Sequence, residues 1–304
     1  MLEQKQVLGP LEVRERVNEI IKTVGDALPW PSGMKESTHT ATSLDGTSLE
    51  IRRFVPEDLL GDSCDSPPER AVIFAFGGGM TAGSVEVFRG FIATIAQQSA
   101  TQVFAPQWRI APENPYPAGV EDVYSSMVWL QAHAAEFHVD PARLVVFGVS
   151  AGGLVAAGAA LMARDRQLDP PLAAQCLRYP CLSDQTAVAA DDPRLGRFTW
   201  SVESNDSAWK IYMGGLEKWE RNDENCPIYA VPLRAQNLDG LPPTHIGVGE
   251  YDILRDENKE YARRLGEGTE LYVYPEMPHG FDANPTLSLG KVMWDREAKF
   301  IQRF

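Results

Sequence analysis

Cysteine and histidine are scarce in this chain of 304 residues, which contains four cysteines and five histidines. The cysteines show no CxxC spacing and are too few for a disulfide scaffold. No HExxH motif occurs, and histidines and cysteines do not cluster at metal-ligand spacing. The sequence therefore predicts no catalytic metal and buried or idle thiols. The four cysteines are Cys64, Cys176, Cys181 and Cys226.

Long apolar runs and an excess of basic charge are also lacking. Residues 1–20 mix charges without an apolar centre, so we expect neither a signal peptide nor a membrane span. The 28 basic and 42 acidic residues give a formal net charge of -14. Nucleic acids and anionic membranes would have to be approached against like charge. We therefore expect a cytoplasmic protein with no nucleic-acid partner and no stable membrane association.

The elements that are present follow an α/β pattern. Residues 11–28 place apolar side chains at helical spacing, and residues 38–56 alternate around Asp45 and Gly46 as a hairpin does. Further along, short apolar or β-branched runs alternate with helical stretches, which predicts a largely parallel sheet covered by helices on both faces. These runs are residues 71–76, 101–106, 144–149, 173–180, 244–250 and 270–275.

A GxSxG motif formed by Gly148, Ser150 and Gly152 follows one of these strands and precedes a helix predicted over residues 152–165. A sharp strand-to-helix turn needs glycines beside the serine, because larger side chains would collide with neighbouring backbone. The alternative is a glycine-rich turn with an incidental serine. The position between strand and helix favours a nucleophile elbow that exposes the Ser150 hydroxyl.

A serine nucleophile needs a base, and the base needs an acid that holds its tautomer. Only His279 follows a predicted strand at its carboxyl end, where such sheets bind ligands. Asp252 lies just beyond the preceding strand, whereas Asp256 is explained by charge in the first turn of a helix. The order Ser150, Asp252, His279 is the order found in hydrolases. The other histidines are His39, His133, His138 and His245.

Three consecutive glycines, Gly77, Gly78 and Gly79, follow the first run of the predicted parallel sheet. Attack on a carbonyl produces an oxyanion that backbone N–H groups stabilise, and glycines let the backbone come close. We therefore predict an oxyanion hole formed by these glycines and the N–H of Ala151. The alternative is a phosphate cradle, since Gly77, Gly79 and Ala82 satisfy a relaxed GxGxxG/A pattern. No lysine follows as in a P-loop, and the next strand end offers no acid for a ribose.

Five segments resemble motifs of one family, the hormone-sensitive-lipase-like α/β-hydrolases, which include bacterial, fungal and plant carboxylesterases. The match runs from about residue 70 to the carboxyl terminus and, more loosely, through the amino-terminal helix. The segments are GGGMTAGS (residues 77–84), WRIAPENPYPAGVED (108–122), GVSAGG (148–153), DILRDE (252–257) and PHGF (278–281).

This resemblance implies a single α/β-hydrolase domain, residues 1–304, with a mostly parallel eight-stranded sheet, helices on both faces and a helical cap. We expect residues 1–35 and about 185–225 to form the cap. The catalytic core is then about residues 38–184 and 226–304.

The resemblance also implies the triad of Ser150, His279 and Asp252, no cofactor, and hydrolysis of carboxylic esters with short or medium acyl chains. The substrate is then a small-molecule ester, for example the acylated form of a specialised metabolite. A homodimer formed through an edge strand near residues 270–276 is a further expectation from the family.

Two departures from the family pattern stand beside the oxyanion elements. Phe76 replaces the histidine before the glycines, and Val149 replaces the acid before the nucleophile. Either neighbouring side chains still hold the loop in an ordinary esterase, or the site serves a bulky or apolar substrate or a different chemistry. The complete triad favours the ordinary esterase.

Aromatic and sulfur-containing side chains of the cap are further candidates for substrate contact. Their alternative role is to attach the cap to the core, which is the commoner role of Trp and Met. Together with Phe76 and Val149, which depart from the family pattern, the candidates for substrate contact are Trp30, Trp200, Trp209, Tyr212 and Met213.

Two other functions stay open. A dehydratase, lyase or cyclase on the same scaffold would use Ser150 or His279 for proton transfer, and Phe76 and Val149 are its sequence support. A ligand-binding relative is the other, and the intact triad counts against it.

Overall fold

The computed structural model describes residues 10–60, 69–284 and 287–304. Its strands form one sheet of eight in the order β1-β2-β4-β3-β5-β6-β7-β8. The pairs from β4 across to β8 are parallel, whereas β1 with β2 and β2 with β4 are antiparallel. The strands are β1 (Met34–Thr42), β2 (Ser48–Pro56), β3 (Glu69–Ala75), β4 (Gln102–Pro106), β5 (Val139–Val149), β6 (Ala174–Arg178), β7 (Thr244–Gly249) and β8 (Thr269–Tyr274).

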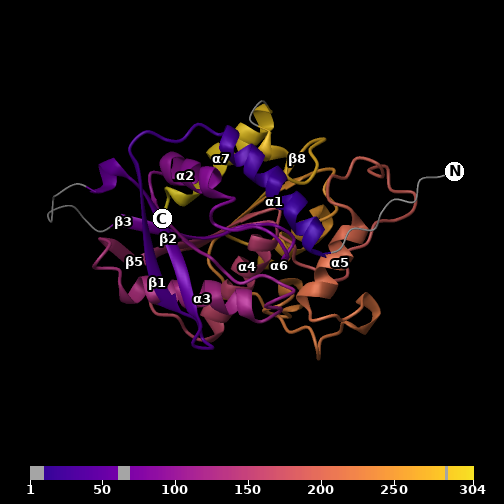
Figure 1. Cartoon of the computed structure of the whole chain (residues 1–304). Helices are drawn as coiled ribbons and strands as arrows, with labels where there is room; N and C mark the ends of the chain where they lie inside the picture. The colour runs from indigo at the N-terminus through magenta and orange to yellow at the C-terminus, as the bar shows by residue number, and fades with distance from the viewer. Residues whose placement is uncertain (1–9, 61–68, 285–286) are drawn as a thin grey trace.

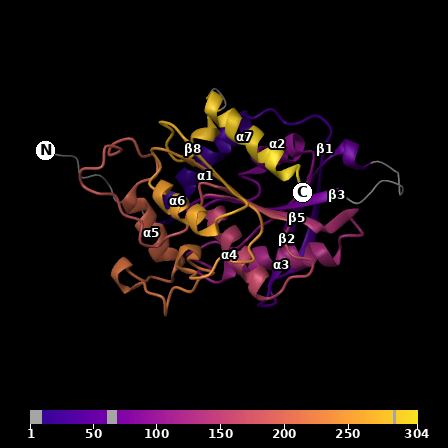
Figure 2. The same cartoon turned by 180° about the vertical axis from the view of Figure 1, so that it is seen from behind.

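Helices cover both faces of the sheet (Figures 1 and 2). On one face α2 packs against α7 and against β2 and β4, and on the other α3, α4 and α6 pack against the parallel strands. The helices are α1 (Pro10–Ala27), α2 (Arg89–Ser99), α3 (Ala118–Ala132), α4 (Ala151–Asp165), α5 (Val202–Tyr212), α6 (Arg255–Leu265) and α7 (Ser288–Ile301). Single 3-10 turns are η1 (Glu57–Leu60), η2 (Lys218–Glu220), η3 (Pro232–Arg234) and η4 (Phe281–Ala283).

The central strands read as continuous apolar runs because both of their faces are covered. Every residue of β4, β6 and β7 is buried. The predicted hairpin is also present: Thr42 pairs with Ser48, and Gly46 turns the chain with a φ of 86°. The sheet therefore matches the strands predicted from the sequence.

The helix between β6 and β7 has different limits from those that the sequence pattern indicates. The pattern favours a helix within residues 206–220, but α5 begins at Val202, where the Ser201 hydroxyl accepts the Ser204 N–H at 3.1 Å. It ends at Tyr212 because Gly214 and Gly215 follow with φ values of 70° and 101°. Cys64 lies outside the described residues.

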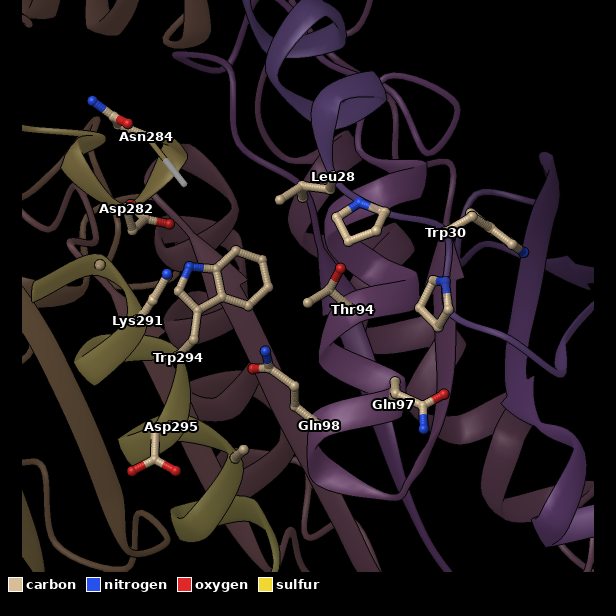
Figure 3. A pocket seen from close by; sticks show the side chains of 14 residues that line it. Leu28, Trp30, Thr94, Gln97, Gln98, Asp282, Asn284, Lys291, Trp294 and Asp295 are labelled. Atoms are coloured by element: carbon tan, nitrogen blue, oxygen red, sulfur yellow. The ribbon is translucent and has the colours of Figure 1, made fainter. Parts of the chain in front are cut away.

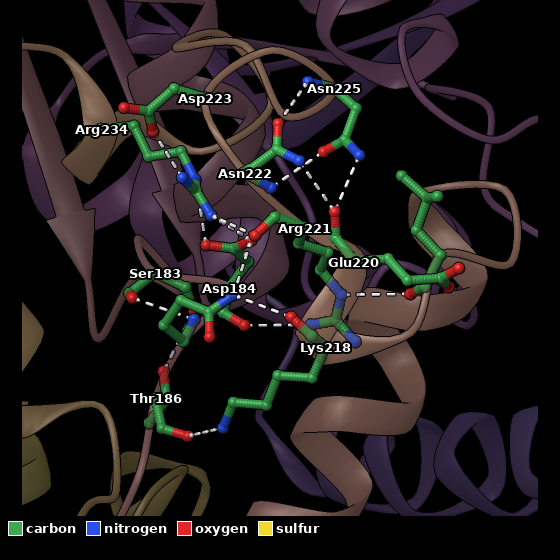
Figure 4. A network of polar contacts seen from close by, with 12 residues as sticks. Ser183, Asp184, Thr186, Lys218, Glu220, Arg221, Asn222, Asp223, Asn225 and Arg234 are labelled. Atoms are coloured by element: carbon green, nitrogen blue, oxygen red, sulfur yellow. Dashed lines mark hydrogen bonds and ion pairs between the residues drawn. The ribbon is translucent and has the colours of Figure 1, made fainter.

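Residues 179–243 form an insertion between β6 and β7 that carries α5, η2 and η3. A polar network secures it (Figure 4). The buried Asp184 carboxylate accepts the Arg234 guanidinium at 2.8 and 3.1 Å, and its carbonyl accepts Arg221 at 2.9 Å. Arg221 also pairs with Asp206 at 2.7 Å. The insertion is therefore held together by ion pairs among its own residues, in which the Asp184 and Arg221 side chains are buried.

Candidate active site

Ser150 stands between β5 and α4, in the turn predicted as a nucleophile elbow. Its φ of 55° and ψ of -118° are unusual for a residue with a side chain, and such strain is typical of functional turns. The Ser150 N–H donates to the carbonyl of Arg178 at 2.9 Å, which ties the turn to β6.

The two glycines of the motif are required by close backbone approach. A Cβ on Gly148 would lie 2.2 Å from the carbonyl oxygen of Gly152. A Cβ on Gly152 would lie 2.0 Å from the carbonyl oxygen of Ala75. Neither position admits a larger residue without moving the backbone, so the local structure explains the GxSxG spacing.

The three residues predicted as a triad lie together. Ser150 Oγ is 3.0 Å from His279 Nε2, and His279 Nδ1 is 2.7 Å from Asp252 Oδ2. Asp252 is fully buried, and its other oxygen accepts the Leu254 N–H at 2.9 Å. Arg194 donates to the Asp252 carbonyl at 3.0 Å. This geometry can move a proton from the hydroxyl to an imidazole whose orientation a carboxylate fixes.

The remaining candidates for acid and base lie elsewhere. Asp256, at the start of α6, pairs with Arg255 and Arg194. His245 is buried on β7 beside the rings of Tyr272 and Phe300, and burial lowers its pKa to about 4. None of these residues lines the cavity around Ser150 described below.

The glycine loop lies against the nucleophile. A Cβ on Gly77 would come within 2.8 Å of the Val149 carbonyl and 3.4 Å of the Ser150 Cβ. Gly78 and Gly79 have φ values of 129° and 60°, which favour glycine. Within the described residues, the N–H groups of Gly78, Gly79 and Ala151 donate no hydrogen bond, so they are free to bind a developing oxyanion.

An apolar cavity of about 360 Å³ opens over these residues. Of the candidate contacts, Val149 and Trp200 line it. Sequence analysis did not name the α1 and α2 side chains that form much of its wall, although the apolar face of residues 11–28 carried the signal. These are Val17, Ile20, Ile21, Val24, Phe91 and Ile95.

Four other candidates are not among the residues that line this cavity. Phe76 is fully buried and stacked on Trp108, with ring centroids 4.7 Å apart. The other three pack into a buried apolar cluster that also contains Ala151, so they support the elbow from behind. They are Trp209, Tyr212 and Met213.

Trp30 contributes to a second cavity, of about 630 Å³, between the end of α1, α2 and α7 (Figure 3). Trp30 and Trp294 stand on opposite sides of it, with Thr94 and Gln98 of α2 between them. No triad residue lines it.

A buried ionic cluster lies beside the triad, and sequence analysis did not identify it. Arg178 donates to Asp282 at 2.6 Å and to Glu297, while Tyr179 OH donates to Asp282 at 2.7 Å. The Tyr179 ring packs edge-on against His279, with centroids 4.5 Å apart. Burial raises the pKa of Glu297, and the Arg178 guanidinium opposes that rise. The cluster gives the imidazole a rigid neighbour.

Two other kinds of site are absent from the part of the chain that the structure describes. No group of three or more His, Cys, Asp or Glu side chains is arranged to hold a metal ion there. No helix there has both the length and the apolarity needed to cross a membrane.

Several known proteins with similar sequences or structures are esterases by name. Carboxylesterase NlhH of Mycobacterium tuberculosis is 36% identical over 218 residues, which are 69% of this chain and 66%, just under two thirds, of the relative. The arylesterase of Saccharolobus solfataricus is 30% identical over 258 residues, 84% of this chain and 78% of the relative. The solved structure of a Pyrobaculum calidifontis esterase superposes with a TM-score of 0.82 at 27% identity, covering 99% of this chain and 96% of that one.

A family model described as alpha/beta hydrolase fold matches residues 72–283, which include Ser150, Asp252 and His279. The family match and the eight-stranded, mostly parallel sheet confirm the fold and the family predicted from the sequence motifs. The chain belongs to the alpha/beta hydrolase fold family.

Proposed function

We propose that the chain is a serine carboxylesterase that hydrolyses small carboxylic esters through an acyl-enzyme on Ser150. The esterase names of its relatives support the enzyme class, carboxylic ester hydrolase. The observation that carries the mechanism is the hydrogen-bonded series Ser150, His279, Asp252 next to free N–H groups at the floor of an apolar cavity.

In the proposed reaction, His279 Nε2 takes the hydroxyl proton as Ser150 Oγ attacks the ester carbonyl, and Asp252 holds the imidazolium. The oxyanion is stabilised by N–H groups of Gly78, Gly79 and Ala151, each donor being worth roughly 3 kcal/mol. The alcohol leaves with the proton from His279. Water, deprotonated by His279, then attacks the acyl-enzyme, and the proton returns to Ser150 as the acid is released.

The cavity supports a substrate with a short or medium acyl chain. Its volume of about 360 Å³ lies at the small end of ligand pockets, and its wall is mainly aliphatic and aromatic. The physiological reaction that we propose is the removal of an acyl group from a specialised metabolite. The formal charge of -14 supports a small-molecule partner rather than a nucleic acid.

We extend the proposal to the organisation of the enzyme. Residues 1–35 and about 185–225 form the cap of a single domain, supported by the α1 side chains and Trp200 at the cavity. The enzyme acts in the cytoplasm without a cofactor. A homodimer through β8 is supported by the position of that strand at the edge of the sheet.

A non-hydrolytic reaction receives little support from the two departures. Phe76 is stacked on Trp108 outside the cavity, so it cannot contact a substrate there. Val149 does line the cavity and is the remaining observation in favour of altered chemistry. The complete triad counts against a ligand-binding relative.

The test compares hydrolysis of acetyl, butyryl, octanoyl and palmitoyl p-nitrophenyl esters by wild type, Ser150→Ala and Ser207→Ala. Ser207 is an exposed serine of α5 and serves as the matched control. We expect turnover to be highest on the short esters and to fall at least about 10³-fold in Ser150→Ala, with no change in Ser207→Ala. A folded wild type that releases no acyl group, or equal turnover by Ser150→Ala, would contradict the proposal.

A further inference from the structure

Helix α1 reaches the glycine loop through Arg14. Its guanidinium donates to the Thr81 carbonyl at 2.5 Å and to the Ala111 carbonyl at 2.8 Å. It also forms a two-pronged ion pair with Glu113, at 2.6 and 2.9 Å. One side chain thus joins the segment after the glycines to the proline-rich segment behind it.

Asn18 makes a second contact from the same helix face, four residues along. Its Oδ1 accepts the Gly83 N–H at 2.7 Å. Further down this face, α1 meets α2 by close backbone approach, since a Cβ on Gly90 would lie 2.3 Å from the Gly25 carbonyl oxygen. Helix α1 is therefore fixed at both ends, and two of its polar contacts reach the glycine loop.

The loop satisfies only some of its own polar groups. The Gly78 carbonyl accepts the N–H groups of Thr81 and Ala82 at 3.3 and 2.9 Å, and the Met80 carbonyl accepts the Ala111 N–H at 3.0 Å. The Thr81 carbonyl and the Gly83 N–H are instead satisfied by α1. Phe76, where the family has a histidine, offers no side-chain hydrogen bond.

We propose that Arg14 and Asn18 are positioning residues for the oxyanion loop, residues 77–83, so that the cap helix holds the loop in its active geometry. The inference rests on the proposed esterase function. Val17 and Ile21 of the same helix line the cavity. A substrate bound under α1 and the donors that stabilise its oxyanion therefore depend on one rigid element.

The kinetic test uses matched pairs of variants on one helix. Arg14→Met keeps the apolar stem and removes the guanidinium, and Asn18→Leu removes the acceptor that Asn18→Asp retains. Lys22→Met is the control, because Lys22 is exposed and forms its ion pair with Asp26 in the same helix. We expect kcat on p-nitrophenyl butyrate to fall about 10- to 100-fold in Arg14→Met and Asn18→Leu, with a smaller change in KM. Asn18→Asp and Lys22→Met should stay within about twofold of wild type.

A readout independent of activity separates this inference from the proposed function. Hydrogen–deuterium exchange of residues 77–84 should be about tenfold faster in Asn18→Leu than in wild type, Asn18→Asp and Lys22→Met. Unchanged exchange there overturns the inference whatever the kinetics show, and so does a loss of kcat in Lys22→Met equal to that in Arg14→Met. If wild type hydrolyses no ester while exchange responds as expected, the proposed function fails and the loop support stands.

Discussion

The two segments that border the candidate active site, helix α1 and the insertion between β6 and β7, differ in how deeply their side chains are buried. Helix α1 has an exposed outer surface, with Ile20 65% exposed although it also lines the cavity. The insertion contributes fully buried aromatic residues such as Trp209, and the buried Asp184 carboxylate pairs with its Arg234. One segment is a thin cover over the cavity, and the other is part of the core.

Because of this difference, we expect substitutions in the two segments to affect different properties, namely stability and substrate binding. Substitutions in the insertion should change the free energy of unfolding, because they disturb buried ion pairs such as that of Asp184 with Arg234. Substitutions of those α1 side chains that face solvent or the cavity should change kinetics while leaving the free energy of unfolding nearly unchanged.

The largest expected effect is that of Asp184→Asn. Arg234 binds two carboxylates, Asp184 with a side chain 1% exposed and Asp223 with one 76% exposed. Removing the buried charge leaves the guanidinium without its buried partner, so we expect a loss of about 3–5 kcal/mol in the free energy of unfolding. Asp223→Asn, the control on the same arginine, should cost less than about 1 kcal/mol. Urea unfolding measures both, and equal effects would show that the insertion is not held by its buried pair.

The next effect is a pH dependence that originates at Glu257. This buried carboxyl on α6 accepts hydrogen bonds from the Leu182 and Ser183 N–H groups and from the Thr186 hydroxyl at the start of the insertion. Burial raises its pKa to about 8. The folded state therefore binds the proton more tightly than the unfolded state, whose pKa is near 4.3. Stability from this group is full below that value and is lost as the pH rises through about 8.

The measurement is urea unfolding of wild type and Glu257→Gln from pH 5 to pH 8. The difference between the two proteins isolates Glu257 from other groups, including His245, whose depressed pKa acts in the opposite direction between about 4 and 6.5. We expect wild type to lose stability relative to Glu257→Gln across this range. Parallel curves would show that Glu257 is ionised to the same degree in both states.

How far the sequence could predict these features depends on how local they are. The sharp turn at Ser150 and the parallel strands follow from glycine spacing and apolar runs, which are local patterns. The sequence alone therefore predicts both. The Arg178 cluster joins β6 with residues about a hundred positions later, and no local spacing marks such a pair. The sequence also indicated only part of the cavity wall. Residue type favours aromatic side chains such as Trp209 as substrate contacts, whereas the aliphatic face of α1 forms much of the wall. Whether an aromatic side chain points to a cavity or to the core depends on tertiary packing.

A smaller effect is expected from Ile20→Ala, which trims the cover without touching the insertion. Loss of three carbon atoms from the cavity wall should raise KM for p-nitrophenyl octanoate about 3- to 10-fold with kcat nearly unchanged. The free energy of unfolding should change by less than about 0.5 kcal/mol, because the side chain is largely exposed. The acetyl ester is the control, since its short chain should not reach Ile20. An equal rise in KM for both esters would contradict a role of α1 in holding the acyl chain.

The smallest effect is expected from Lys22→Met. This variant shows how little an exposed substitution in α1 changes the free energy of unfolding and the kinetics. Lys22 and Asp26 form an exposed pair on α1, with the Nζ and Oδ2 atoms 2.7 Å apart and side chains 53% and 67% exposed. Water screens such a pair, so its removal should change the free energy of unfolding by at most about 0.5 kcal/mol. Urea unfolding and the kinetics on p-nitrophenyl butyrate should both match wild type. A loss of 2 kcal/mol or more, on the order of that expected for a buried pair, would mean that α1 is fixed as firmly as the insertion, and the division between cover and core would no longer hold.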